Sequence, residues 1–247
     1  MEYTPTEGVF HGDSKGDDSQ KLHAGKFVAQ MKNKVFFLND TSSGHSGSQA
    51  VVNSLDYRIK LAGGIVIGRH YHNQFQVDEA AFCESDVVLA NGEGVIHHRQ
   101  PTGRFVLETL RRAQQLGKKT ALVNALVQEV PPYFEDVFSR LDLTAVRDPW
   151  SEQFVRNLGG RPELFLDSCV DPHVCNLGRK TKNLSRIVVS DSHFNAPIQL
   201  ELDQLGYPGF YLDMPWNDVI STLSSASLYI TPRYHRFYAA APAGVPA

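Results

Sequence analysis

Short apolar runs alternate with segments of helical periodicity along most of this 247-residue chain. The run Val35-Phe36-Phe37-Leu38 has the length of a buried strand, and the segment 48–62 that follows carries apolar residues at helical spacing. Neighbouring parallel strands need a crossover connection, which is usually a helix, so this alternation indicates a parallel sheet with helices on both faces. The sequence therefore predicts an α/β fold.

The alternation occurs in two series, which a polar stretch at 171–184 separates. The first series has expected strands at 34–39, 65–68, 86–90, 120–124, 143–146 and 164–166, and expected helices at 48–62, 102–116 and 151–158. The second has expected strands at 186–190, 209–212 and 227–231, and a short helix at 216–225. We predict a loose polar lead-in at 1–30, an α/β domain at 31–170, a linker at 171–184 and a second α/β domain at 185–247, with a cleft between the domains.

The composition narrows the class of protein. The net charge is −3, so the chain does not have the excess of basic residues that is typical of a nucleic-acid-binding domain. The three cysteines, Cys83, Cys169 and Cys175, are too few and too scattered for a disulfide framework. No apolar run reaches the roughly 20 residues of a membrane span, and the amino terminus has no signal-peptide core. We expect a cytoplasmic protein with no nucleic-acid partner and no membrane span.

An arginine and a histidine, Arg233 and His235, follow the last expected strand. Side chains two residues apart in an extended segment point the same way, and ligands of open α/β sheets bind at the carboxyl ends of strands. The guanidinium forms a fork of donors that fits carboxylate or phosphate, and the imidazole carries a proton that moves near neutral pH. Two interpretations are open: proton transfer on a bound anion, or a surface arginine beside a capping histidine.

Three further candidates follow expected strands. His45 lies in the small-residue loop 41–48, which is either a cleft-lining loop at an anion-attracting helix terminus or an ordinary loop with a serine cap. Arg147 follows the strand 143–146 and is either a substrate contact or a surface residue. His193 follows the first strand of the second series and is a cleft-lining candidate.

The loop Asn91-Gly92-Glu93-Gly94 follows the strand 86–90. We predict that it lines the cleft, with glycine backbone donors exposed to a substrate and with Glu93 accepting hydrogen bonds from sugar hydroxyls. The alternative is a tight turn that needs a positive φ.

The sequence indicates no metal site. The adjacent His97 and His98 point in different directions and have no carboxylate partner at a ligand spacing. Cys169, His173 and Cys175 lack a fourth ligand.

Several of these segments together resemble one family. The segment from Trp216 to Ala247, with its Arg-x-His, resembles the carboxyl-terminal signature of the polysaccharide pyruvyl transferase family. The run 90–98 resembles the family's strand-loop pattern in members with two histidines, and 117–125 is similar to its next strand. The run 147–151 resembles its Arg-x-x-x-Ser element, and 39–48 its amino-terminal loop. The resemblance runs from about residue 33 to the end, and the order and spacing of the motifs carry it.

The resemblance implies a fold and an activity. The fold is two Rossmann-like domains similar to the GT-B architecture of glycosyltransferases. The activity is transfer of the enolpyruvyl group of phosphoenolpyruvate to a sugar of a cell-surface polysaccharide or glycan, which leaves a pyruvate ketal. By this resemblance, Arg233 and Arg147 hold the carboxylate and phosphate of the donor, and His235 protonates its methylene carbon. No cofactor is implied beyond the donor substrate.

Two alternatives stay open, a GT-B-type glycosyltransferase that uses a nucleotide sugar and an inactive carbohydrate-binding remnant. The sequence names neither the acceptor sugar nor the oligomeric state.

The chain departs from the family at two places. Pro232 stands where the family is expected to have glycine, and the sequence stops at Ala247, where family members usually continue with a strand and helices. The resemblance therefore implies a second domain that is truncated at its carboxyl terminus. Uncovered apolar surface in such a domain predicts self-association or poor solubility.

Overall fold

The computed structural model of the chain describes residues 33–175, 186–190, 201, 204–205 and 214–247. The predicted lead-in at 1–30, the predicted strand at 209–212, residues 176–184 of the predicted linker and the candidate His193 lie outside the described residues. The chain from Lys32 to Ala247 forms one compact unit. The predicted domain boundaries and the predicted truncation stay predictions.

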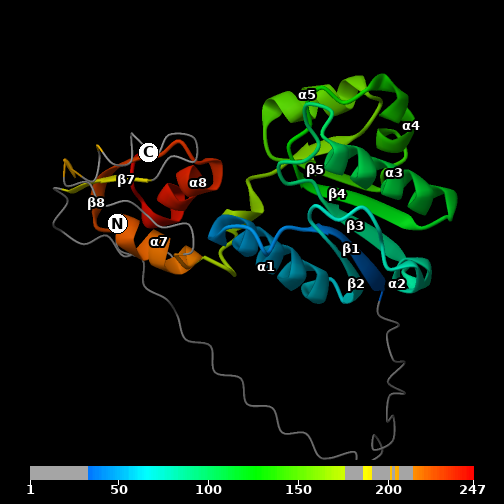
Figure 1. Cartoon of the computed structure of the whole chain (residues 1–247), viewed down its shortest axis with the longest axis horizontal. Coiled ribbons are helices and arrows are strands. Elements are labelled where there is room, and N and C mark those ends of the chain that lie inside the picture. The colour runs from blue at the N-terminus through cyan, green and yellow to red at the C-terminus, as the bar shows by residue number, and fades with distance from the viewer. Residues whose placement is uncertain (1–32, 176–185, 191–200, 202–203, 206–213) are drawn as a thin grey trace, which may run out of the picture. The chain divides into compact units, whose positions relative to one another are not determined.

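A parallel sheet of six strands is the larger of two sheets (Figure 1). Its strands are β1 (Lys34–Asp40), β2 (Ile65–Tyr71), β3 (Val87–Asn91), β4 (Lys119–Ala125), β5 (Leu143–Val146) and β6 (Pro162–Leu164). Their order is β2-β1-β3-β4-β5-β6, and every neighbouring pair is parallel. Because β2 and β3 lie on opposite sides of β1, the strand order reverses between β1 and β3, which is where open α/β sheets bind ligands.

Helices cover both faces of this sheet. They are α1 (Ser46–Leu61), α2 (Glu79–Glu84), α3 (Pro101–Gln115), α4 (Glu135–Phe138) and α5 (Pro149–Asn157), with 3-10 turns η1 (Pro132–Phe134) and η2 (Ser168–Val170). Successive side chains of β1 alternate between the faces: Phe36 packs with the apolar residues of α2 to α5, and Phe37 packs with those of α1. Figure 1 shows α3, α4 and α5 on one side of the sheet and α1 on the other.

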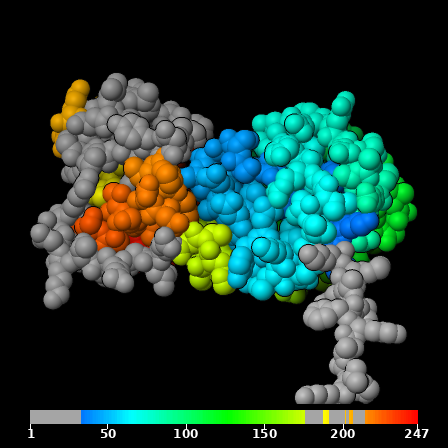
Figure 2. All heavy atoms as spheres, turned by 90° about the horizontal axis from the view of Figure 1, so that it is seen from below, coloured from blue at the N-terminus to red at the C-terminus, as the bar shows by residue number. Residues whose placement is uncertain are grey.

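The smaller sheet pairs β7 (Arg186–Val189) in parallel with β8 (Ala226–Ile230). Two helices accompany it, α7 (Trp216–Leu223) and α8 (Tyr234–Ala243). Their buried residues, including Val219 and Ala239, belong to the same hydrophobic core as Val51 of α1. Figure 2 shows the atoms of α7, in orange, beside those of α1, in blue. This packing brings the carboxyl-terminal helices to the amino end of α1.

Among the described residues, the predicted parallel strands of both sheets are confirmed with one exception. The last strand of the first series is shifted, because it spans Pro162–Leu164 rather than 164–166. Its partner β5 ends at Val146, which pairs with Leu164, so no strand remains for later residues to pair with along the sheet. Leu166 is consequently 75% exposed.

The prediction that the chain is extended from Arg233 to His235 is wrong. Helix α8 begins at Tyr234, and Arg233 is its N-cap residue. The buried positions Ala239, Ala240 and Ala243 have helical spacing, and alanine has the highest helix propensity, so the run folds back as a helix. The short helices α2 and α4 were likewise not predicted, since each spans less than two turns.

The first residue of the predicted linker, Asp171, packs against α1. The carboxylate of Asp171 accepts hydrogen bonds from Arg58 Nε at 2.7 Å and from Ser54 Oγ at 2.9 Å, both on α1. None of the helices in the described part of the chain combines the length and apolar character needed to cross a bilayer.

Candidate functional site

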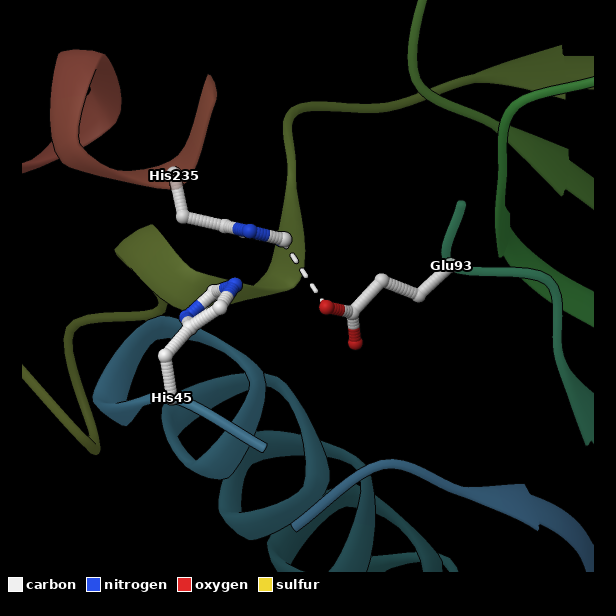
Figure 3. Close-up of side chains that lie close together, drawn as sticks. All are labelled: His45, Glu93 and His235. Carbon is white, nitrogen blue, oxygen red and sulfur yellow. Dashed lines mark ion pairs between the residues drawn. The ribbon is translucent and has the colours of Figure 1, made fainter. Parts of the chain in front are cut away.

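Buried polar side chains from separate segments meet at the carboxyl edge of the six-stranded sheet. His45 follows β1, Glu93 follows β3, Arg147 follows β5, Asp167 follows β6, and His235 lies in the first turn of α8. We call these residues the central cluster. In Figure 3 the side chains of His45, Glu93 and His235 converge on one point from their three segments. The central cluster therefore lies at the point where the strand order reverses between β1 and β3. A ligand site is expected at this point.

The carboxylate of Glu93 is held by hydroxyl groups on both oxygens. Thr41 Oγ1 donates to Oε2 at 2.7 Å, and Ser48 Oγ makes a short hydrogen bond to Oε1. Asn91 Nδ2 lies 3.3 Å from Oε2. Since Glu93 is only 6% exposed, these contacts fix its orientation, and Oε1 lies 3.3 Å from Nε2 of His235.

The other side of His235 faces a buried ion pair. Arg147 Nη1 donates to Asp167 Oδ2 at 2.6 Å, and His235 Nε2 lies 3.5 Å from both of these atoms. The guanidinium of Arg147 also stacks on the ring of Tyr234, 4.2 Å from its centroid. His235 therefore lies between two carboxylates and a guanidinium, in a region largely shielded from water.

Gly47 allows the first turn of α1 to approach His235 this closely. A Cβ atom at this position would lie 2.6 Å from Cβ of His235 and 3.0 Å from its Cγ. These atoms are close to the backbone of α8 and have little freedom to move aside. A residue without a side chain is therefore required where α1 and α8 meet.

His45 is the N-cap residue of α1, and this determines its tautomer. Its Nδ1 accepts hydrogen bonds from the backbone N–H groups of Gly47 and Ser48 at 3.2 and 3.3 Å. Burial, followed by the proximity of His235, lowers the pKa of His45 from 6.5 to about 4. At neutral pH the ring is therefore uncharged, and its proton lies on Nε2.

The stability of the fold should depend on pH through His45. Between about pH 6.5 and pH 4 the unfolded chain binds a proton at this ring that the folded chain does not bind, so the free energy of unfolding falls as the pH falls, by up to about 3 kcal/mol. His45→Asn keeps a good helix cap and removes the titrating group. Urea denaturation at pH 7 and pH 4.5 should show a smaller loss of stability in the variant than in the wild type, and equal losses would contradict the assignment.

Three side chains of the central cluster are of the types that bind metal ions. His45, Glu93 and His235 each offer one ligand atom, and these atoms lie within 4.8 Å of one another. However, Nδ1 of His45 is occupied by the helix cap, which places the proton on Nε2, and both oxygens of Glu93 already accept hydrogen bonds. In this arrangement the residues fit a hydrogen-bonded site better than a metal centre.

The structure brings together several of the residues predicted from the sequence. Asn91, Glu93, His45, Arg147 and His235 all lie in or beside the central cluster. Glu93 was expected to accept hydrogen bonds from sugar hydroxyls, whereas both of its oxygens are used by protein hydroxyls.

Two other candidates are placed differently from the prediction. The N–H of Gly92 donates to Val123 O at 2.8 Å, so it is not the exposed backbone donor that was expected. Its lack of a side chain has another reason, because a Cβ would lie 2.5 Å from Cβ of Ala125 on the neighbouring strand. Arg233 does not share a helix face with His235, but its charge acts on the pKa of His45.

Sequence reasoning missed Asp167 and Arg236. Asp167 is 1% exposed and follows the apolar residues after β6, which is the same signal that identified Arg147 after β5. Arg236 is 3% exposed in the first turn of α8, and its charge also acts on His45. It follows the Arg-x-His motif directly, but only the helical conformation turns it inward.

A cavity of about 650 Å³ reaches the cluster at Arg147 and Asp167. Asn124 also lines this cavity. It lies near the carboxyl end of β4 and has a positive φ of 53°. Arg147 Nε and Asn124 Nδ2 are buried donors with no hydrogen-bond partner among the described residues. Burying an unpaired donor is costly, and both residues line the same cavity next to the central cluster.

No protein-family model and no curated protein sequence matches the chain. Among solved structures, the chain is similar to an alpha-glucosyltransferase in complex with UDP and a 13-mer DNA containing a HMU base. The identity is 10%, the TM-score is 0.43, and the match covers 80% of this chain and 71% of the other. A likeness with this TM-score supports no conclusion about this chain's fold or activity.

Proposed function

We propose that this chain transfers a group from a phosphate-bearing donor to a sugar hydroxyl, and that the donor is phosphoenolpyruvate. The observation that supports this best is the buried pairing of Arg147 with His235, 3.5 Å apart at the carboxyl edge of the sheet. A guanidinium suits an anionic oxygen, and a histidine suits proton transfer. The motifs that resemble polysaccharide pyruvyl transferases include both residues.

In the proposed reaction Arg147 and Arg233 bind the phosphate and carboxylate of phosphoenolpyruvate. His235 donates its proton to the methylene carbon, which becomes a methyl group, and the adjacent carbon is attacked by a sugar hydroxyl. The proton of that hydroxyl restores His235. A second hydroxyl then displaces inorganic phosphate and gives up its proton to it, which leaves the ketal. General acid catalysis contributes about 10²–10⁴-fold, and the guanidinium groups stabilise the charge that develops on phosphate.

A glycosyltransferase that uses a nucleotide sugar is the second candidate, on one specific observation. The cavity beside Arg147, of about 650 Å³, is much larger than phosphoenolpyruvate and lies within the size range of nucleotide-sized ligand sites. In that case Arg147 would bind the diphosphate of the donor. The GT-B architecture that the family resemblance implies belongs to both candidates.

Calorimetry with phosphoenolpyruvate and with UDP-glucose distinguishes the two donors. We expect binding of phosphoenolpyruvate and, with an oligosaccharide acceptor, formation of a pyruvate ketal detected by NMR together with release of inorganic phosphate. Binding of UDP-glucose without binding of phosphoenolpyruvate would overturn the main proposal in favour of the second candidate. Binding of neither donor would contradict both.

Arg233→Lys should weaken binding of phosphoenolpyruvate. Lysine keeps the positive charge and loses the planar fork that binds a carboxylate through two hydrogen bonds, so we expect the dissociation constant to rise about tenfold. Arg156→Lys, at an exposed ion pair with Glu152, is the matched control and should leave the dissociation constant unchanged. An unchanged constant in Arg233→Lys would remove Arg233 from the donor site.

A further inference from the structure

We propose that a second cavity, beside the amino end of α3, binds an acidic sugar residue, one that bears a carboxylate, sulfate or phosphate group. This inference rests on the proposed function only in assigning that residue to the acceptor glycan. The cavity has a volume of about 370 Å³. It does not include any residue of the central cluster, but its first lining residue, Val95, lies two positions after Glu93.

The floor and the rim of this cavity differ in character. Ile96, Leu107 and Phe134 line it with buried apolar side chains, and Arg99 and Arg104 line it with exposed guanidinium groups. A ligand that fits must therefore combine an apolar surface with a negatively charged group.

No carboxylate in the described part of the chain neutralises the two arginines. Neither has an ion-pair partner among the described residues, and no acidic residue lines the cavity. Arg112 and Arg140 on the same side of the sheet are different, because they pair with Glu79 and Asp136. Guanidinium groups without a protein partner at the rim of a cavity favour an anionic ligand, since carboxylate and phosphate match their paired donors.

An exposed tyrosine completes the rim. Tyr133 is 55% exposed, and its ring packs against the ring of Phe134, with 4.5 Å between the two centroids. A pyranose ring carries C–H groups on one face and hydroxyl groups at its edge, so it packs on an aromatic ring and hydrogen-bonds at its perimeter. A ring-shaped ligand with one acidic group therefore fits this cavity better than inorganic phosphate does.

The loops around the cavity hold residues in an unfavourable conformation. His98, Arg99 and Glu129 have φ angles of 49°, 54° and 50°, in the left-handed region that L-residues seldom adopt. The loops are joined by a hydrogen bond from Gln128 N to Ile96 O of 3.0 Å. Backbone strain of this kind, held in place by neighbouring structure, is commonly found at ligand sites.

Binding of short oligosaccharides to the whole chain tests the proposal without phosphoenolpyruvate. The probes are trigalacturonate, neutral galactotriose and a sulfated galactotriose, with dissociation constants measured by NMR titration. We expect the two acidic probes to bind at least tenfold more tightly than the neutral one, and the stronger of the two identifies the acidic group. Equal affinity for neutral and acidic probes, or binding of none, would overturn the proposal.

Variants locate the binding. Arg99→Gln combined with Arg104→Gln should remove the preference for acidic probes, and Tyr133→Ala should weaken all three probes severalfold. Arg161→Gln is the matched control, because Arg161 is also exposed and has no ion-pair partner among the described residues. Its affinities should equal those of the wild type. An acidic preference that survives the double replacement would place the site elsewhere and overturn the proposal.

The two proposals fail separately. A chain that prefers acidic probes but makes no ketal from phosphoenolpyruvate contradicts the proposed function alone. A chain that makes the ketal but binds neutral and acidic probes equally contradicts the acidic-sugar site alone.

Discussion

His235→Gln is expected to reduce ketal formation from phosphoenolpyruvate by about 10²-fold or more, while the dissociation constant of the donor stays within about threefold of the wild type. Glutamine resembles histidine in size and keeps an N–H, so the contacts with Glu93 and Asp167 can persist. It has no proton to transfer near neutral pH. Turnover should therefore fall, whereas Arg147, the proposed donor-binding residue, is unchanged.

Phosphate release and calorimetry on the same preparations measure the two quantities. His173→Gln is the matched control, since His173 is exposed and stacks on Tyr57, away from the central cluster. It should retain full turnover. Near-normal turnover in His235→Gln would remove His235 from the chemistry and leave it a packing residue between α1 and α8.

Asp167→Asn is expected to lower the free energy of unfolding by about 3–5 kcal/mol. The side chains of Arg147 and Asp167 are 4% and 0% exposed, and their ion pair has a length of 2.6 Å. The replacement keeps the shape of the side chain but leaves the charge of Arg147 buried without a counter-charge. Removing one partner of a buried ion pair costs much more free energy of unfolding than replacing both partners by apolar residues.

Urea denaturation followed by far-UV circular dichroism measures this loss. The control is Glu152→Gln, which breaks an exposed ion pair with Arg156 and should cost less than about 1 kcal/mol. Replacing both partners, as Arg147→Met with Asp167→Leu, should recover most of the stability, because no charge is then left unpaired. Equal losses in Asp167→Asn and Glu152→Gln would show that the buried pair is not needed for the fold.

The strands of the sheet could be predicted from the sequence because their signals are local. Four consecutive apolar residues from Val35 to Leu38 can only be a strand buried on both faces or part of a buried helix, and the short length favours the strand. The alternation with helical segments then makes the sheet parallel, because each crossover needs a helix. The polar residues directly after these strands, Glu93 and Arg147 among them, were candidates for the same reason.

The partners of those residues could not be predicted, because they depend on packing between distant segments. Glu93 is held by Thr41 and Ser48, about 50 residues away, and faces His235 from the far end of the chain. No spacing in the sequence encodes such contacts.

The sequence by itself determined the parallel α/β sheet and the strand ends at which polar residues gather, since hydrophobic periodicity follows directly from the order of residues. Only the tertiary structure decided that Arg233 occupies the N-cap position of α8, that His235 and Arg236 turn inward, and that Asp167 pairs with Arg147. Local spacing suggested an extended run at Arg233, but burial of Ala239 and Ala240 against the core favoured a helix there. Burial of a helix face is a property of the whole packed chain, and it outweighs the preferences of a few residues.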